Sequence, residues 1–214
     1  MAGMSPRYSD LLAAVTESQA RVETTLAELT DDEARGPSQL PDWTRGHVVT
    51  HVSRNADALW RFVRGVLTGV PVTQMYPGGP DARAAAIEEG ADRPASLLAA
   101  DFHFAGSRVL SVLGELTEDL FETPVAWRRP VPARDLPILR WRELEIHHVD
   151  LGLDYTASDW PAEFVQSTLE SELPRLREAA PEVSVPELAD HELLAWLIGR
   201  PQSDGLPQLP PWPF

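Results

Sequence analysis

Two short segments of the chain contain side chains that could bind a metal ion. The first carries His47 and His51, and the second carries Glu143 and His147. The members of each pair are four residues apart, so they share one face if the segment is helical. Brought together, His51, Glu143 and His147 would bind a metal through three ligands and leave one coordination position open. An open position is typical of a catalytic zinc site rather than a structural one.

Each pair alone is a weak signal, because helices often carry such spacings, and Glu143 with His147 is also typical of a solvated helix face. However, His51 lies among apolar residues such as Val48 and Val52, and Ile146 is next to His147. Buried polar groups are costly unless they have partners, and a shared metal would provide one. The zinc-protease pattern His-Glu-x-x-His is absent, because Val48 stands where that motif has glutamate.

The composition restricts the chemistry further. The 214-residue chain has no cysteine and no lysine, which excludes cysteine nucleophiles, thiolate-bound zinc, disulfides and Schiff-base catalysis. Any thiol used at the site must therefore come from outside the protein. Acidic residues outnumber basic ones 33 to 18, and the resulting charge of −15 argues against partners such as nucleic acid or anionic membranes. With no signal peptide and no long apolar run, we expect a cytoplasmic protein.

The elements that position these residues are predicted to be helices. Apolar residues recur at helical spacing, and Thr44 is a suitable N-cap for the helix that carries His51. A shorter helix is expected at 81–89, and 123–135 is expected to be an irregular crossover connection. Four long helices joined in this way indicate an up-down four-helix bundle. Their expected ranges are 6–29, 44 to 65 or 69, 94–116 and 135–153.

The C-terminal part has a different pattern. We expect helices at about 159–180 and 191–199, a short strand at 183–186, and an extended tail from Pro207. The predicted fold is therefore mainly α: a metal-binding bundle over residues 1–155, followed by a small α/β appendage over residues 156–214.

The ordered motifs of the chain resemble the mycothiol-dependent maleylpyruvate isomerase family, which belongs to the DinB-like superfamily of metal-binding four-helix bundles. The resemblance spans nearly the whole sequence. It is carried by Trp43-Thr-Arg-Gly-His-Val-Val-Thr-His51 with Asn55, by Met75-Tyr76, by Arg142-Glu143-x-x-x-His147-x-Val-Asp150-Leu-Gly152, and by Gly199-Arg200 with Ser203-Asp-Gly205.

The resemblance implies Zn²⁺ bound by His51, Glu143 and His147, with mycothiol, the low-molecular-weight thiol of actinobacteria, as cosubstrate. A zinc-bound thiol is deprotonated near neutral pH, and its thiolate could add to the cis double bond of maleylpyruvate. Rotation and loss of the thiol would then give fumarylpyruvate. The resemblance also implies that Arg200 is important for activity. The alternative is that Arg200 is a cation that compensates the macrodipole at a helix C-terminus. Asp150 could orient a ligand imidazole or cap its helix.

Three functions remain open at this point. The first is the cis-trans isomerase, and the second is a mycothiol S-transferase that acts on an electrophilic toxin or biosynthetic intermediate. The third is a non-catalytic metal-binding module that acts in regulation. For the enzyme functions the expected partners are a small-molecule substrate and a thiol, and the expected oligomeric state is a monomer or a homodimer.

Overall fold

The computed structural model describes residues 8–127, 129–201 and 203–213. The chain divides into two compact units, Met1–Gly152 and Leu153–Phe214. The first unit contains the residues predicted to bind a metal, and the second contains Arg200.

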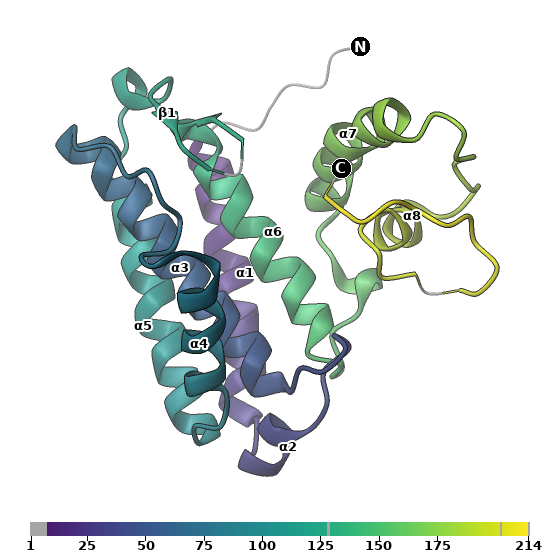
Figure 1. The fold of residues 1–214 in the computed structure, drawn as a ribbon, viewed down its shortest axis with the longest axis horizontal. Helices are drawn as coiled ribbons and strands as arrows, with labels where there is room; N and C mark the ends of the chain where they lie inside the picture. The colour runs from purple at the N-terminus through teal and green to yellow at the C-terminus, as the bar shows by residue number, and fades with distance from the viewer. Residues whose placement is uncertain (1–7, 128, 202, 214) are drawn as a thin grey trace. The chain divides into compact units, whose positions relative to one another are not determined.

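The first unit is a four-helix bundle, which confirms the predicted mainly α fold (Figure 1). Helices α1 and α3 each pack against both α5 and α6, and they make little contact with one another. Leu59, Phe62, Val109 and Leu136 are among the buried residues that form the core between them. The bounds of the four helices are α1 Tyr8–Glu28, α3 Arg45–Thr68, α5 Ala95–Leu113 and α6 Leu136–Asp150.

The long crossover of the bundle lies between α3 and α5, not at residues 123–135 as the sequence suggested. Arg54 of α3 pairs with Asp101 of α5, and further along both helices Asp57 pairs with Arg108, so α3 and α5 run in the same direction. Parallel helices need a return segment, and helix α4 (Gly79–Ala91) provides it (Figure 1).

The segment 123–135 is a short connection at one end of the bundle. It contains a two-stranded antiparallel ladder of β1 (Pro124–Val125) and β2 (Val131–Pro132), which the sequence analysis did not predict. With only two residues in each strand, the ladder has too few alternating positions to leave a signal in the sequence.

The start of α3 is fixed by its cap and by a glycine. Thr44 is the N-cap, as predicted, and its side chain accepts a hydrogen bond from the backbone N–H of His47. A Cβ atom at Gly46 would lie 2.1 Å from the carbonyl oxygen of Ala91, so only glycine allows this approach. The close contact holds the C-terminal end of α4 against the first turn of α3. The short helix α2 (Asp31–Arg35) comes before α3 in the chain.

The second unit contains helices α7 (Ala162–Ala179) and α8 (Asp190–Leu197), close to the predicted ranges. The predicted strand at 183–186 is wrong: no strand forms within residues 153–201 and 203–213. An isolated extended segment lacks a partner strand, and Pro186 has no N–H to donate. The tail packs on its own unit, because Trp212 Nε1 donates to Glu172 Oε2 at 3.0 Å.

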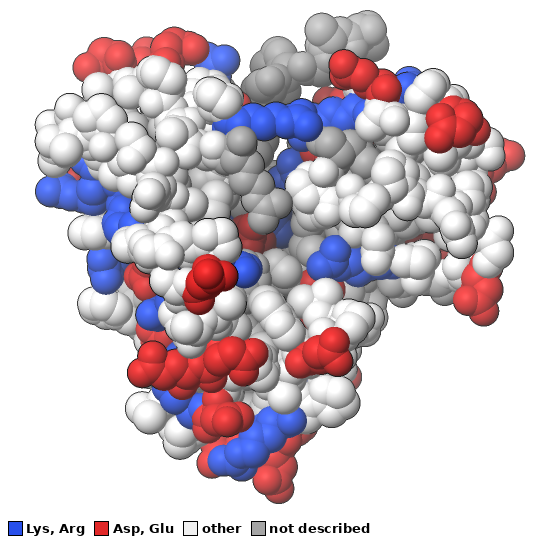
Figure 2. Space-filling view, viewed as in Figure 1, with Lys and Arg blue, Asp and Glu red and all other residues white. Residues whose placement is uncertain are grey.

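In the part of the chain that the structure describes, no helix combines the length and the apolar character needed to cross a membrane. Acidic side chains gather where the bundle carries α2 and the C-terminal end of α4 (Figure 2). Exposed residues there include Asp32, Glu88 and Glu89. This region therefore carries part of the excess of acidic residues that gives the protein its negative net charge.

Candidate metal centre

Three side chains from two helices converge at one point in the bundle. His51 comes from α3, and Glu143 and His147 come from α6. His51 Nε2 lies 3.1 Å from His147 Nε2 and 3.2 Å from Glu143 Oε2, and the remaining distance, between His147 Nε2 and Glu143 Oε2, is 3.5 Å. One ligand atom from each residue thus lies within 4.8 Å of the others.

The helices place these atoms by simple geometry. Glu143 and His147 are one turn apart on α6, so both side chains leave the same face. His51 lies in the second turn of α3, close behind the Thr44 cap that fixes the start of that helix. The exposed fractions of the side chains are 9% for His51, 14% for His147 and 25% for Glu143. The cluster is therefore mostly buried, with its most accessible side at Glu143.

Asp150 orients the imidazole of His147. Its Oδ2 lies 2.8 Å from His147 Nδ1, and its side chain is fully buried. A carboxylate here accepts a hydrogen bond from Nδ1–H, so the proton stays on Nδ1 and the Nε2 lone pair is directed at the cluster. Of the two roles considered for Asp150, the contact supports orientation of the ligand.

The electrostatics of the cluster favour a bound cation. Burial acts to raise the pKa of Glu143, but the close approach and positive charge of the His147 and His51 imidazoles outweigh it and hold that pKa well below its usual range. Burial acts to lower the pKa of His147, whereas Asp150 and Glu143 raise it to about 9. Burial lowers the pKa of His51. The carboxylates that hold a proton on His147 would equally attract a divalent metal.

The residues present fit a zinc ion. Glu143 Oε2 is buried and has no hydrogen-bond partner, although two imidazole nitrogens are close to it. Such an orphaned oxygen is costly unless something binds it. Two imidazoles and one carboxylate form a common catalytic zinc donor set, and a cation among the three ligand atoms would satisfy the oxygen.

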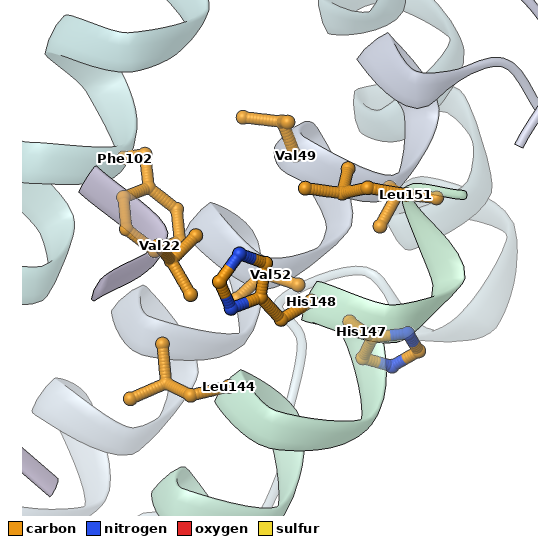
Figure 3. A pocket seen from close by; sticks show the side chains of 9 residues that line it. Val22, Val49, Val52, Phe102, Leu144, His147, His148 and Leu151 are labelled. Atoms are coloured by element: carbon orange, nitrogen blue, oxygen red, sulfur yellow. The ribbon is translucent and has the colours of Figure 1, made fainter. Parts of the chain in front are cut away.

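Two other histidines near these motifs lie outside the cluster. His47 caps α3, since its Nδ1 accepts from the backbone N–H of Thr44 at 3.2 Å. His148 turns into an apolar pocket of the bundle, and its Nε2 lies 2.8 Å from Thr25 Oγ1. Figure 3 shows the rings of His147 and His148 leaving α6 in different directions.

Arg83 is a neighbour of the cluster that the sequence analysis missed. It extends from α4, and its Nη2 lies 2.9 Å from His51 Nδ1. The ring of Trp43 also packs against His51, with the two ring centroids 5.6 Å apart. Arg83 is 32 residues from His51 in the sequence, and no motif links them. Only the packing of α4 on α3 brings them together.

Arg200 lies in the second unit, directly after α8. Its Nη1 donates to the carbonyl oxygen of Ile198 at 2.8 Å, and its backbone N–H donates to Ala195. Gly199 has a φ of +77°, the left-handed conformation that commonly ends helices. These contacts agree with a cation at a helix C-terminus, and the role of Arg200 in activity stays a prediction.

Replacing Asp150 with asparagine should weaken zinc binding by roughly 10- to 100-fold, the usual effect of losing an oriented partner of a histidine ligand. The variant keeps the shape of the side chain but removes the charge that holds the His147 tautomer. Competition with a chromophoric chelator measures the affinity, and Asp92→Asn, on an exposed residue, is the matched control. Equal affinity of Asp150→Asn and wild type would show that Asp150 does not support the ligand.

Comparison with known proteins gives two kinds of match. The family model described as "Mycothiol maleylpyruvate isomerase N-terminal domain" matches residues 15–152. A crystal structure of the mycothiol-dependent maleylpyruvate isomerase is 24% identical, with a TM-score of 0.85 over 97% of this chain and 98% of that chain. A histidine-to-alanine mutant of a protein with that description gives 22% and 0.84 over the same shares. A search of the curated proteins finds no significant match. At these identities the solved structures establish a shared fold.

Proposed function

The chain belongs to the mycothiol maleylpyruvate isomerase family, and from this we propose that it is a zinc- and mycothiol-dependent cis-trans isomerase. Its substrate in this proposal is maleylpyruvate or a related cis-enone acid, and its product is the trans isomer. The observation that carries the proposal is the convergence of His51, Glu143 and His147 on one point, in a chain without cysteine.

The residues of the site have distinct tasks in this scheme. His51 and His147, as neutral imidazoles, and the Glu143 carboxylate would hold the metal and leave it with a net positive charge. Bound zinc would lower the pKa of a coordinated thiol, so that the thiolate is available near neutral pH. Asp150 keeps the His147 proton on Nδ1, away from the metal-binding nitrogen.

The proposed reaction needs no redox partner. The thiolate adds to one carbon of the activated cis double bond, and the electron pair of that bond moves into the adjacent carbonyl as an enolate. The former double bond is now single and rotates. Collapse of the enolate expels the thiolate and forms the trans double bond, so the thiol is returned unchanged.

Incubating the zinc-loaded protein with mycothiol and maleylpyruvate tests the proposal. We expect loss of substrate absorbance over many turnovers per thiol, with trans product by NMR and no net consumption of mycothiol. Consumption of one thiol per substrate, with a stable adduct, would instead identify the S-transferase. No reaction, despite bound zinc and thiol, would favour the non-catalytic metal-binding module.

Arg200 is proposed to bind a substrate carboxylate or to stabilise the enolate through its planar guanidinium. Arg200→Met should therefore lower kcat/KM by roughly 100-fold, a loss typical of removing one preorganised stabilising donor. Zinc content should stay at the wild-type level. Arg200→Lys, which keeps the charge, should recover part of the activity; unchanged kcat/KM in Arg200→Met would remove Arg200 from the scheme.

A further inference from the structure

The guanidinium of Arg83 lies beside the candidate metal centre, and no described residue forms an ion pair with it. Its Nη2 is 2.9 Å from His51 Nδ1, and its guanidinium carbon lies 5.4 Å from the centroid of the Tyr76 ring. Nearby arginines differ: Arg54 and Arg93 both pair with Asp101. Among the residues that the structure describes, no carboxylate lies within ion-pair distance of Arg83. A half-buried cation is thus left next to a proposed metal ligand.

The contact between Arg83 and His51 is incompatible with a metal on His51 Nε2. A neutral imidazole has one nitrogen with a free lone pair and one that carries hydrogen. If the Nε2 lone pair binds the metal, Nδ1 must be the N–H donor. It would then face Arg83, which has only donors. The guanidinium must turn to another acceptor, and the described residues offer it no carboxylate.

We propose that Arg83 binds a carboxylate group of the substrate. A carboxylate between Arg83 and His51 could accept from the guanidinium and from the Nδ1–H of the metal-bound imidazole, so both donors would be satisfied. Charge-assisted bonds of this kind are strong, and the planar guanidinium can make two in parallel. The inference rests on the proposed function, which supplies an anionic substrate.

The negative net charge of the protein gives such a residue a second role. A dicarboxylate approaching a chain of charge −15 is repelled over distances up to about a Debye length, roughly 10 Å at 0.1 M salt. An unpaired arginine at the site provides local attraction. Maleylpyruvate has a carboxylate at each end, and Arg83 is assigned to one of them.

Binding of maleate, a cis-dicarboxylate, to the zinc-loaded protein tests the inference by isothermal titration calorimetry. We expect Arg83→Met to weaken maleate binding about 10- to 100-fold, which corresponds to the loss of a charged hydrogen bond. Arg35→Met is the matched control, because it removes the same charge from an exposed arginine paired on α2. It should bind maleate like wild type.

Zinc affinity distinguishes substrate binding from simple positioning of His51. If Arg83 only held the imidazole, Arg83→Met would weaken zinc binding. We expect zinc affinity equal to or tighter than wild type, because a repelling cation has been removed. Weakened zinc binding, equal maleate affinities in wild type and Arg83→Met, or no maleate binding to wild type would overturn the inference. Lack of turnover with maleylpyruvate would instead contradict the proposed function, whatever maleate does.

Discussion

Glu143→Gln is expected to abolish detectable turnover and to weaken zinc binding by more than about 100-fold, beyond the loss typical of outer partners. The substitution keeps the shape of the side chain and removes only the charge. In the wild-type protein Glu143 Oε2 is a buried oxygen without a hydrogen-bond partner, and it lies close to the Nε2 atoms of both imidazoles. A neutral amide there would leave a divalent metal with two neutral ligands and no compensating anion.

Zinc content after dialysis and kcat/KM with mycothiol present measure the two losses. Glu89→Gln, on the exposed face of α4, makes the same charge change and should behave as wild type. Circular dichroism should show an unchanged helix content for both variants. If Glu143→Gln kept full zinc occupancy, Glu143 would not be a ligand.

Arg140→Ala should produce the largest loss of stability, about 2–5 kcal/mol of the free energy of unfolding, the usual range for truncating a large buried side chain. The Arg140 side chain is fully buried, although burial lowers its pKa only to about 10, so it remains charged at neutral pH. Its guanidinium donates to the carbonyl oxygen of Val52 at 2.8 Å and to Gln19 Oε1 at 3.0 Å. Alanine would remove the donor of Gln19 Oε1 and the extra hydrogen bond to Val52, and it would leave a new cavity.

Urea unfolding followed by tryptophan fluorescence measures this loss. Arg134→Ala is the control, because Arg134 forms an exposed ion pair with Glu122, and it should change stability by less than about 1 kcal/mol. Arg140→Lys keeps the charge but has fewer donors, so its free energy of unfolding should lie between those of Arg140→Ala and wild type. If Arg140→Ala does not fold, Arg140→Lys provides the test. A loss under about 1 kcal/mol for Arg140→Ala would contradict the argument.

Much of the helical fold could be predicted because its signals are local. The N-cap at Thr44 and the apolar periodicity of the long helices depend on residues within a few turns, and the observed helix bounds lie close to the predicted ones. The direction of α5 is not a local property. It depends on whether α4 returns the chain, so the sequence alone placed the crossover at 123–135 instead of between α3 and α5.

The candidate site was partly visible in the sequence for the same reason. Glu143, His147 and Asp150 share one helix, so their spacing predicts shared faces. Joining His51 to them required the resemblance or the fold. Arg83 could not be found, because its contact with His51 depends on α4 packing against α3.

The remaining failures also have physical causes. Val183–Pro186 has the residue types of a strand, but a strand forms only where a partner is available, and that information is not local. His47 is not included in the predicted metal-binding set, although its spacing to His51 places both residues on one helix face. In the structure its ring nitrogen caps α3 at Thr44 instead, a role that residues at the third helical position commonly take.

The most direct test of the central claim is a zinc titration of the metal-free protein, with stoichiometry read by atomic emission after gel filtration. Wild type should bind one zinc ion tightly, and the double variant His51→Ala/His147→Ala should bind none while keeping its helical circular dichroism spectrum. One tightly bound zinc ion in the double variant would contradict the proposed metal centre and the chemistry built on it.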